Sequence, residues 1–360
     1  MPIFPFQTHS LNRAAYHSLA RHRTITQISQ ASSNQQARAV HTAASPTLVP
    51  PLPDQWKQTF TYHTGTLSGL AVHPKGQVVS ASYDGTVQRK DFYANTPPAV
   101  IKQGGDGNMP TSLSLLGKDW LFAAGYDKGL IELWNMSYGG GGQLGSHRGP
   151  VNGTIGMFNS LWNRAFVISA SQDSSIKAWD PARANTYVYD VGSHSGPIYS
   201  FITGNGIQAI SGSEDNTIKI WNPFASMFSG SLLKTLYAGQ AVSTLVFIPA
   251  QNILVSGSKN STTIKVWDLS DLTKANLQIN AFDAPSSAGG VASLVAFPNG
   301  SIATGQMSGD ILLWNPLDKE PFLYPLPKKH QSTVTALAVL NDGSLASGSE
   351  DRTINWWTSK

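Results

Sequence analysis

The chain has 360 residues, of which 41% are hydrophobic, 10% aromatic and 13% charged, and it contains 33 Gly, 21 Pro and 10 Trp. This composition predicts an all-β protein with many turns. The absence of Cys excludes disulfides, thiolate metal sites and Cys nucleophiles. No apolar run approaches the length of a membrane span, so we expect no membrane segment.

Positive charge gathers near the start of the chain. Residues 1–53 contain four Arg and no Lys, Asp or Glu, whereas residues 54–360 contain 21 basic and 21 acidic side chains. A neutral body carries no net field that would attract nucleic acid. We therefore expect no nucleic-acid partner.

Residues 1–53 are predicted to form a disordered N-terminal tail that ends in a Pro-rich linker, "SPTLVPPLP". Within the tail, residues 11–21 have the spacing of an amphipathic helix. Two interpretations remain open. A disordered basic arm, which is favoured, leaves the protein in the cytoplasm, whereas a transit peptide makes it a mitochondrial assembly factor.

From residue 54 onward the sequence repeats. Three close copies are "SASQDSSIKAWD" at 169–180, "SGSEDNTIKIWN" at 211–222 and "SGSEDRTINWWT" at 347–358, and looser copies begin at residues 80, 123, 256 and 304. The copies end 42 to 47 residues apart, at Lys90, Trp134, Trp179, Trp221, Trp267, Trp314 and Trp357. Each copy predicts two short strands joined by a turn, with another apolar stretch upstream. Seven such four-stranded units predict a ring of blades.

The period and the Trp-Asp-like ends resemble the WD-repeat β-propeller family, over about residues 54–360. The resemblance implies an all-β, seven-bladed propeller. It also implies a hydrogen-bonded tetrad of His, Ser or Thr, Asp and Trp inside each blade. The matching residues are His147, Ser169, Asp173 and Trp179 in blade three; His194, Ser211, Asp215 and Trp221 in blade four; and His330, Ser347, Asp351 and Trp357 in blade seven.

The tetrad contains the residue types of a hydrolase triad, Ser, His and Asp. An active site is needed once, whereas this set occurs three times intact and a fourth time in blade one, where Lys90 replaces Trp beside His63, Ser80 and Asp84. A buried polar network is stable only when every member is satisfied. We therefore interpret the set as structural and expect no enzyme, cofactor or metal site.

Blades two, five and six depart from the pattern. Counting back from each Trp places Lys128, Ser261 and Ser308 where the tetrad Asp is expected, with Asp127 shifted by one residue in blade two. Their turns are expected to be less rigid.

Blade seven lacks a fourth strand after Trp357, three residues before Lys360. Residues 55–62 alternate as a strand does and precede blade one. We expect them to supply the missing strand, because pairing the two ends removes open sheet edges.

The resemblance implies a non-enzymatic scaffold or adaptor that binds proteins or peptides on the top rim, around the channel mouth. The rim positions precede the tetrad Asp or begin the inner strand. They are Tyr83, Tyr126, Asp127, Gln172, Tyr199, Glu214, Asn260, Met307, Thr335 and Glu350. Aromatic residues are enriched in binding hot spots, which favours the Tyr residues as anchors. We expect one monomeric ring within a complex; the alternative is a propeller enzyme with a central-channel site.

Overall fold

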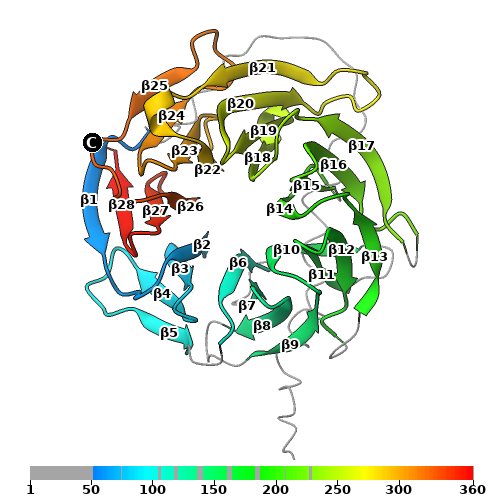
Figure 1. Ribbon diagram of the computed structural model, residues 1–360. Coiled ribbons are helices and arrows are strands. Elements are labelled where there is room, and N and C mark those ends of the chain that lie inside the picture. Colours follow the sequence, from blue (N-terminus) through cyan, green and yellow to red (C-terminus); the bar gives the residue numbers. More distant parts are fainter. Residues whose placement is uncertain are drawn as a thin grey trace, which may run out of the picture.

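The computed structural model describes residues 52–73, 75–103, 107–116, 121–135, 141–159, 164–182, 187–206, 208–226 and 229–359. The expected helix over residues 11–21, and both interpretations of the tail, concern residues outside this set. The described residues form seven four-stranded antiparallel sheets, arranged as blades in a ring (Figure 1). The all-β, seven-bladed prediction is confirmed.

The first four blades follow the chain from the inner strand outward. Blade one consists of β2 (Leu67–Val72), β3 (Gln77–Ser82), β4 (Val87–Asp91) and β5 (Ala99–Lys102). Blade two consists of β6 (Pro110–Leu115), β7 (Leu121–Tyr126), β8 (Leu130–Asn135) and β9 (Gly141–Ser146). Blade three consists of β10 (Val151–Asn159), β11 (Arg164–Ser171), β12 (Ser175–Trp179) and β13 (Tyr187–Ser193). Blade four consists of β14 (Ile198–Thr203), β15 (Ala209–Ser213), β16 (Thr217–Asn222) and β17 (Ser231–Tyr237).

The last three blades complete the ring. Blade five consists of β18 (Thr244–Ile248), β19 (Ile253–Ser258), β20 (Ser261–Asp268) and β21 (Gln278–Asp283). Blade six consists of β22 (Val291–Ala296), β23 (Ile302–Gln306), β24 (Ile311–Trp314) and β25 (Phe322–Pro325). Blade seven contains β26 (Val334–Val339), β27 (Leu345–Ser349) and β28 (Ile354–Thr358). Two short 3-10 helices, η1 (Pro249–Gln251) and η2 (Ser286–Ala288), lie in connections between these strands.

The residue types of each strand match how far the strand lies from the solvent-exposed outer edge of its blade. In blade four, the second strand β15 reads "AISGS" and is buried throughout, since neighbouring blades cover both of its faces. The outer strand of blade five, β21, instead alternates between half-buried and exposed residues, as a strand with one solvated face does. Small and β-branched residues therefore gather in the middle of the blades.

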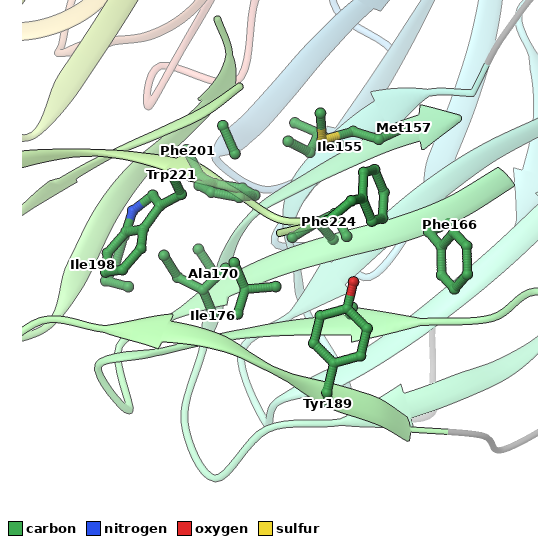
Figure 2. Close-up of a cluster of buried hydrophobic side chains, with 14 residues drawn as sticks. Ile155, Met157, Phe166, Ala170, Ile176, Tyr189, Ile198, Phe201, Trp221 and Phe224 are labelled. Carbon is green, nitrogen blue, oxygen red and sulfur yellow. The ribbon is translucent and has the colours of Figure 1, made fainter. Parts of the chain in front are cut away.

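The hydrophobic core lies between blades. Figure 2 shows the cluster in which Ile176 and Ala170 of blade three lie near Ile198, Phe201 and Trp221 of blade four. Fully burying a side chain such as Ile176 stabilises the fold by about 1.5–3 kcal/mol relative to leaving it exposed. Because much of this area is buried against a neighbouring blade, a blade depends on its neighbours for stability.

The fourth strand of blade seven is β1 (Gln55–Phe60), which pairs antiparallel with β28 from Gln55 opposite Thr358 to Phe60 opposite Ile354. The Lys328 ammonium lies 3.9 Å from the ring centroid of Trp56 and donates to Thr59 Oγ1 at 2.8 Å. Strands from opposite ends of the described chain are thus joined in one sheet, which closes the ring.

Candidate interaction surface at the channel mouth

The expected tetrads come together inside the blades. In blade three, His147 Nε2 lies 2.7 Å from Ser169 Oγ and His147 Nδ1 lies 3.1 Å from Asp173 Oδ2. The Trp179 indole N–H donates to the same Ser oxygen at 2.7 Å. Blades four and seven repeat this arrangement, with His–Asp distances of 2.9 Å in both, His–Ser distances of 2.7 and 2.8 Å, and Trp–Ser distances of 2.8 and 3.0 Å. Blade one keeps the His63–Ser80 and His63–Asp84 contacts at 2.7 and 3.1 Å.

One arrangement of protons satisfies the whole tetrad. The Trp N–H donates to the Ser oxygen, the Ser O–H donates to Nε2 of a neutral His, and the His Nδ1–H donates to the Asp carboxylate. Burial lowers the pKa of His147 and His194, against the opposing effect of the neighbouring Asp, and thus favours the neutral ring. Burial alone would raise the pKa of Asp173, but hydrogen bonds from Ser175 and the Arg148 N–H hold it at about 2.

A hydroxyl two residues after the Asp is a fifth member, which sequence reasoning missed. Thr86, Ser175, Thr217 and Thr353 each donate to their Asp at 2.6 Å. The signal was present, because a Ser or Thr occupies this position in all four blades that hold the His and Asp.

The Ser hydroxyls of these sets are inaccessible. Ser80, Ser169, Ser211 and Ser347 are all 0% exposed. A nucleophile must reach its substrate, and in blades three, four and seven the Ser oxygen also accepts the Trp N–H. The geometry therefore supports the structural interpretation of this repeated Ser–His–Asp set.

The tetrad turns hold the predicted rim residues in equivalent places. In six blades the residue before the tetrad Asp position donates its backbone N–H to a carbonyl just before the inner strand, at 2.8–3.1 Å. The donor residues are Tyr83, Asp127, Gln172, Glu214, Met307 and Glu350. Each side chain thus projects from a turn that the backbone fixes.

In blade five the predicted assignment is wrong by one residue. The Asn260 N–H donates to Ser258 Oγ at 3.2 Å, which is the bond that Asp215 makes to Ser213 at 3.1 Å. Asn260, rather than Ser261, therefore occupies the place of the tetrad Asp, and Lys259 occupies the rim. A register shift between Ser256 and Ser258 separates Trp267 from its Ser by 11 residues instead of 10, which misled the count from the Trp.

The prediction that Tyr126 is a rim anchor is also wrong, because its side chain is 0% exposed. Its hydroxyl donates to Glu132 Oε2 at 2.6 Å, and the Trp134 N–H donates to the same oxygen at 3.0 Å. The Lys102 ammonium lies 4.3 Å from the Tyr126 ring centroid. Blade two thus replaces the tetrad with a different buried cluster, in which Tyr126 is an internal member.

Blades five and six keep part of the network without a His. In blade five, the Trp267 N–H donates to Ser256 Oγ at 3.0 Å. In blade six, the Trp314 N–H donates to Thr304 Oγ1 at 2.9 Å, and the amide of Gln306 donates to the same oxygen at 2.7 Å. The Gln306 amide is therefore the second hydrogen-bond partner of the Thr304 hydroxyl, as a His ring is of the Ser hydroxyl in the regular blades.

Polar side chains near the start of the inner strands join neighbouring blades around the channel. They donate to a backbone carbonyl of the next inner strand, and we call these contacts the clasp. The donors are Ser68, Thr111, Ser112, Asn152, Ser243, Ser293 and Thr335. Sequence reasoning had assigned Thr335 to partner binding alone, and its hydroxyl donates to Leu67 O at 2.6 Å.

Tyr199 of blade four occupies the clasp position but differs in its contacts. The Val242 N–H donates to Ser213 O at 3.0 Å, so a backbone bond joins blades four and five. Burial raises the pKa of Tyr199, and the charge of Glu214 and a hydrogen bond to it raise the pKa further. The ring of Tyr199 therefore lines the mouth beside a carboxylate.

A cavity of about 620 Å³ occupies the channel mouth. Figure 1 shows the first strand of every blade, from β2 to β26, at the inner edge of the ring. The predicted residues that line the cavity are Tyr83, Gln172, Tyr199, Asn260, Thr335 and Glu350, and Lys259 joins them. Asp127, Glu214 and Met307 are not part of this lining, although Met307 is 45% exposed.

Two further features concern the described part of the chain only. There, no three His, Asp or Glu side chains gather as a possible metal site. Over the same residues, no helix is long and apolar enough to cross a membrane.

Comparisons with known proteins agree with the geometry. A family model described as "WD domain, G-beta repeat" matches residues 55–88, 185–222, 230–268 and 323–358. A chain of the "Crystal Structure of Mitotic Checkpoint Complex" is 18% identical, with a TM-score of 0.73 over 91% of this chain and 99% of that chain. The "Crystal structure of WD40 beta propeller domain of Doa1" is 19% identical, with a TM-score of 0.69 over 85% and 97%. At these identities the likeness shows the fold alone, and no curated protein matches the chain.

Proposed function

We propose that this chain, a WD40-repeat β-propeller, is a non-enzymatic scaffold or adaptor that binds a protein or peptide at the channel mouth on its top rim. One observation carries the proposal. Equivalent, backbone-anchored turns present different side chains around a cavity of about 620 Å³. A repeated frame with a varied rim suits recognition of one partner.

The rim carries exposed side chains on turns that are already fixed before a partner binds. Tyr83 is 48% exposed, and its backbone N–H is bonded to Thr66 O at 2.9 Å. Binding then costs less, because the loops that make the contacts are already fixed. Tyr83 and Tyr199 supply large, rigid surfaces of the kind enriched among hot-spot residues.

One of the similar structures is that of a mitotic checkpoint complex, so a chain with this fold occurs there within a complex. For this chain we propose a single ring as the binding unit and a protein rather than a nucleic acid as the partner, since residues 54–360 carry equal numbers of acidic and basic side chains. We place the ring in the cytoplasm, following the favoured interpretation of the tail.

The test compares partner capture by the full chain with capture by a Tyr83→Ala, Tyr199→Ala double variant. Tyr237→Ala is the matched control, since Tyr237 is 79% exposed and does not line the cavity. Captured proteins are identified by mass spectrometry, and binding is then measured with the purified partner. We expect the double variant to lose about 1–4 kcal/mol of binding free energy with an unchanged melting temperature. Undiminished binding by the double variant would place the interaction elsewhere.

A further inference from the structure

Charge is distributed unevenly around the channel mouth. Neighbouring blades seven, one and two present Glu350, Tyr83 and Asp127 at equivalent turn positions, and we call these three residues the acidic sector. Blade five instead presents the cation Lys259 at the equivalent place in the mouth. Glu214 of blade four has the same turn position but lies outside the cavity lining, in which the charged side chains are Glu350 and Lys259. Within the lining, negative and positive charge therefore lie on different blades.

The turns that carry Glu350 and Asp127 belong to the two blades on either side of the blade that carries Tyr83. Burial raises the pKa of Tyr83, and the negative charges of Asp127 and Glu350 raise it further. The aromatic ring remains 48% exposed, and Tyr83 and Glu350 both line the cavity. An accessible ring is thus flanked by negative charge.

The hydrogen bonds that the structure shows to the carboxylates of the sector come from neutral donors. Glu350 accepts a hydrogen bond from Ser332 Oγ at 2.9 Å, and Asp127 accepts one from the Met109 N–H at 2.8 Å. Within the described ranges, neither of them forms an ion pair with Lys, Arg or His. Two other surface carboxylates, Asp268 and Asp310, do have cationic neighbours, since Lys274 lies 3.7 Å from Asp268 and Lys329 lies 3.6 Å from Asp310.

The sector also offers apolar surface and a fixed backbone. Met109 is 41% exposed beside Asp127. The backbone N–H groups of Tyr83, Asp127 and Glu350 donate to carbonyls at 2.9, 2.9 and 3.1 Å, so the three turns are anchored before any partner arrives. A long cationic side chain can therefore bury its methylene groups while its charged end stays among polar atoms.

We propose that the acidic sector holds a Lys or Arg side chain of a bound peptide, with the cation against the Tyr83 ring and between the Glu350 and Asp127 carboxylates. Attraction to the ring face and to two carboxylates favours a cation over a neutral side chain. Lys259 repels the same cation from blade five and so sets the direction in which the peptide crosses the mouth. This inference rests on the proposed function and names the chemistry of its partner.

The probe is a displayed library of random 12-residue peptides, selected on the full-length protein. Peptides that also bind the Tyr83→Ala, Tyr199→Ala variant are removed, so that those retained depend on the mouth. We expect the retained peptides to share a Lys or Arg whose replacement by Gln weakens binding roughly tenfold. The Glu350→Gln, Asp127→Asn double variant should bind the original peptides more weakly by a similar factor. Its affinity for the Gln-substituted peptides should be the same as that of the unchanged protein.

Glu320→Gln is the control, because Glu320 is exposed, lies outside the cavity lining and undergoes the same change in charge. Unchanged thermal unfolding of the variants shows that binding, not folding, is measured. A selection without any mouth-dependent peptide overturns the proposed function as well. Mouth-dependent peptides that need no cation, or whose cation is insensitive to Glu350→Gln and Asp127→Asn, overturn the acidic sector alone.

Discussion

Replacing the tetrad Asp of blade four tests whether the repeated Ser–His–Asp set stabilises the fold. The Asp215 carboxylate accepts hydrogen bonds from His194 Nδ1, from the N–H and O–H of Ser195, and from the N–H and O–H of Thr217, at 2.6–3.2 Å. In Asp215→Ala the exposed Ser195 groups regain water, whereas the buried His194 does not. An unsatisfied buried donor costs about 1–3 kcal/mol, which is the destabilisation expected.

Urea unfolding followed by Trp fluorescence measures the loss, since Trp221 belongs to the same network. Asp271→Ala is a matched control, because Asp271 accepts the same pair of bonds from Thr273, at 3.0 and 2.6 Å, on an exposed loop and without a His. A second control is Ser308→Ala in blade six, whose hydroxyl donates to the Asp310 carboxylate and accepts the Asp310 N–H. Both controls should lose clearly less stability than Asp215→Ala. Equal losses at all three positions would refute the role of the tetrad.

Three further outcomes are expected. Because the folded-state pKa of His63, His147 and His194 is lowered, the unfolded chain binds more protons below pH 6.5, so the free energy of unfolding should fall as the pH drops below that value. It should fall again between about pH 4 and 2, where Asp84 and Asp173 take up protons; a flat profile from pH 7 to 5 would contradict the neutral His. Deleting residues 55–62 removes β1 and should abolish soluble, cooperatively unfolding protein, an outcome that sedimentation and urea titration check. A reporter fused to residues 1–53 should stay in the cytosol, and its cleavage inside an organelle in the native cell type would establish the transit-peptide alternative.

The ring was predictable because its chemistry repeats. Trp residues recur every 42 to 47 residues and mark six of the seven blades. Blade one is the exception, because Lys90 occupies the equivalent position there. The Lys90 ammonium donates to Ala94 O at 2.7 Å and lies 5.7 Å from the Phe60 ring centroid. A buried cation satisfied by loop carbonyls is a local solution, and the repeat pattern does not encode it.

Two rim assignments were wrong because a shift of one residue along the chain changes the direction in which a side chain points. Tyr126 is the last residue of β7 and is buried in the blade, whereas the next residue, Asp127, belongs to the turn and is a rim residue. In blade five a register shift adds one residue, and a count from Trp267 then selects Asn260 in place of Lys259. A count along the sequence assumes constant spacing, and a bulge breaks that assumption.

The difference between Tyr199 and the other clasp positions leads to a final prediction. Asn152 and Tyr199 lie at the same place in neighbouring inner strands, where the register shifts after Val151 and after Ile198. The Asn152 amide donates to Ile198 O at 2.8 Å and holds blade three to blade four. Asn152→Ala should therefore lower the free energy of unfolding by about 0.5–1.5 kcal/mol.

Tyr199→Ala should change that free energy by less than about 0.5 kcal/mol, because the Val242–Ser213 backbone bond already joins blades four and five. The same substitution should weaken partner binding, since Tyr199 lines the mouth beside Glu214. Urea titration of both variants, together with binding to the captured partner, separates the two roles. A larger loss of stability from Tyr199→Ala than from Asn152→Ala would show that Tyr199 holds the ring together, and the side chain could not then be assigned to recognition.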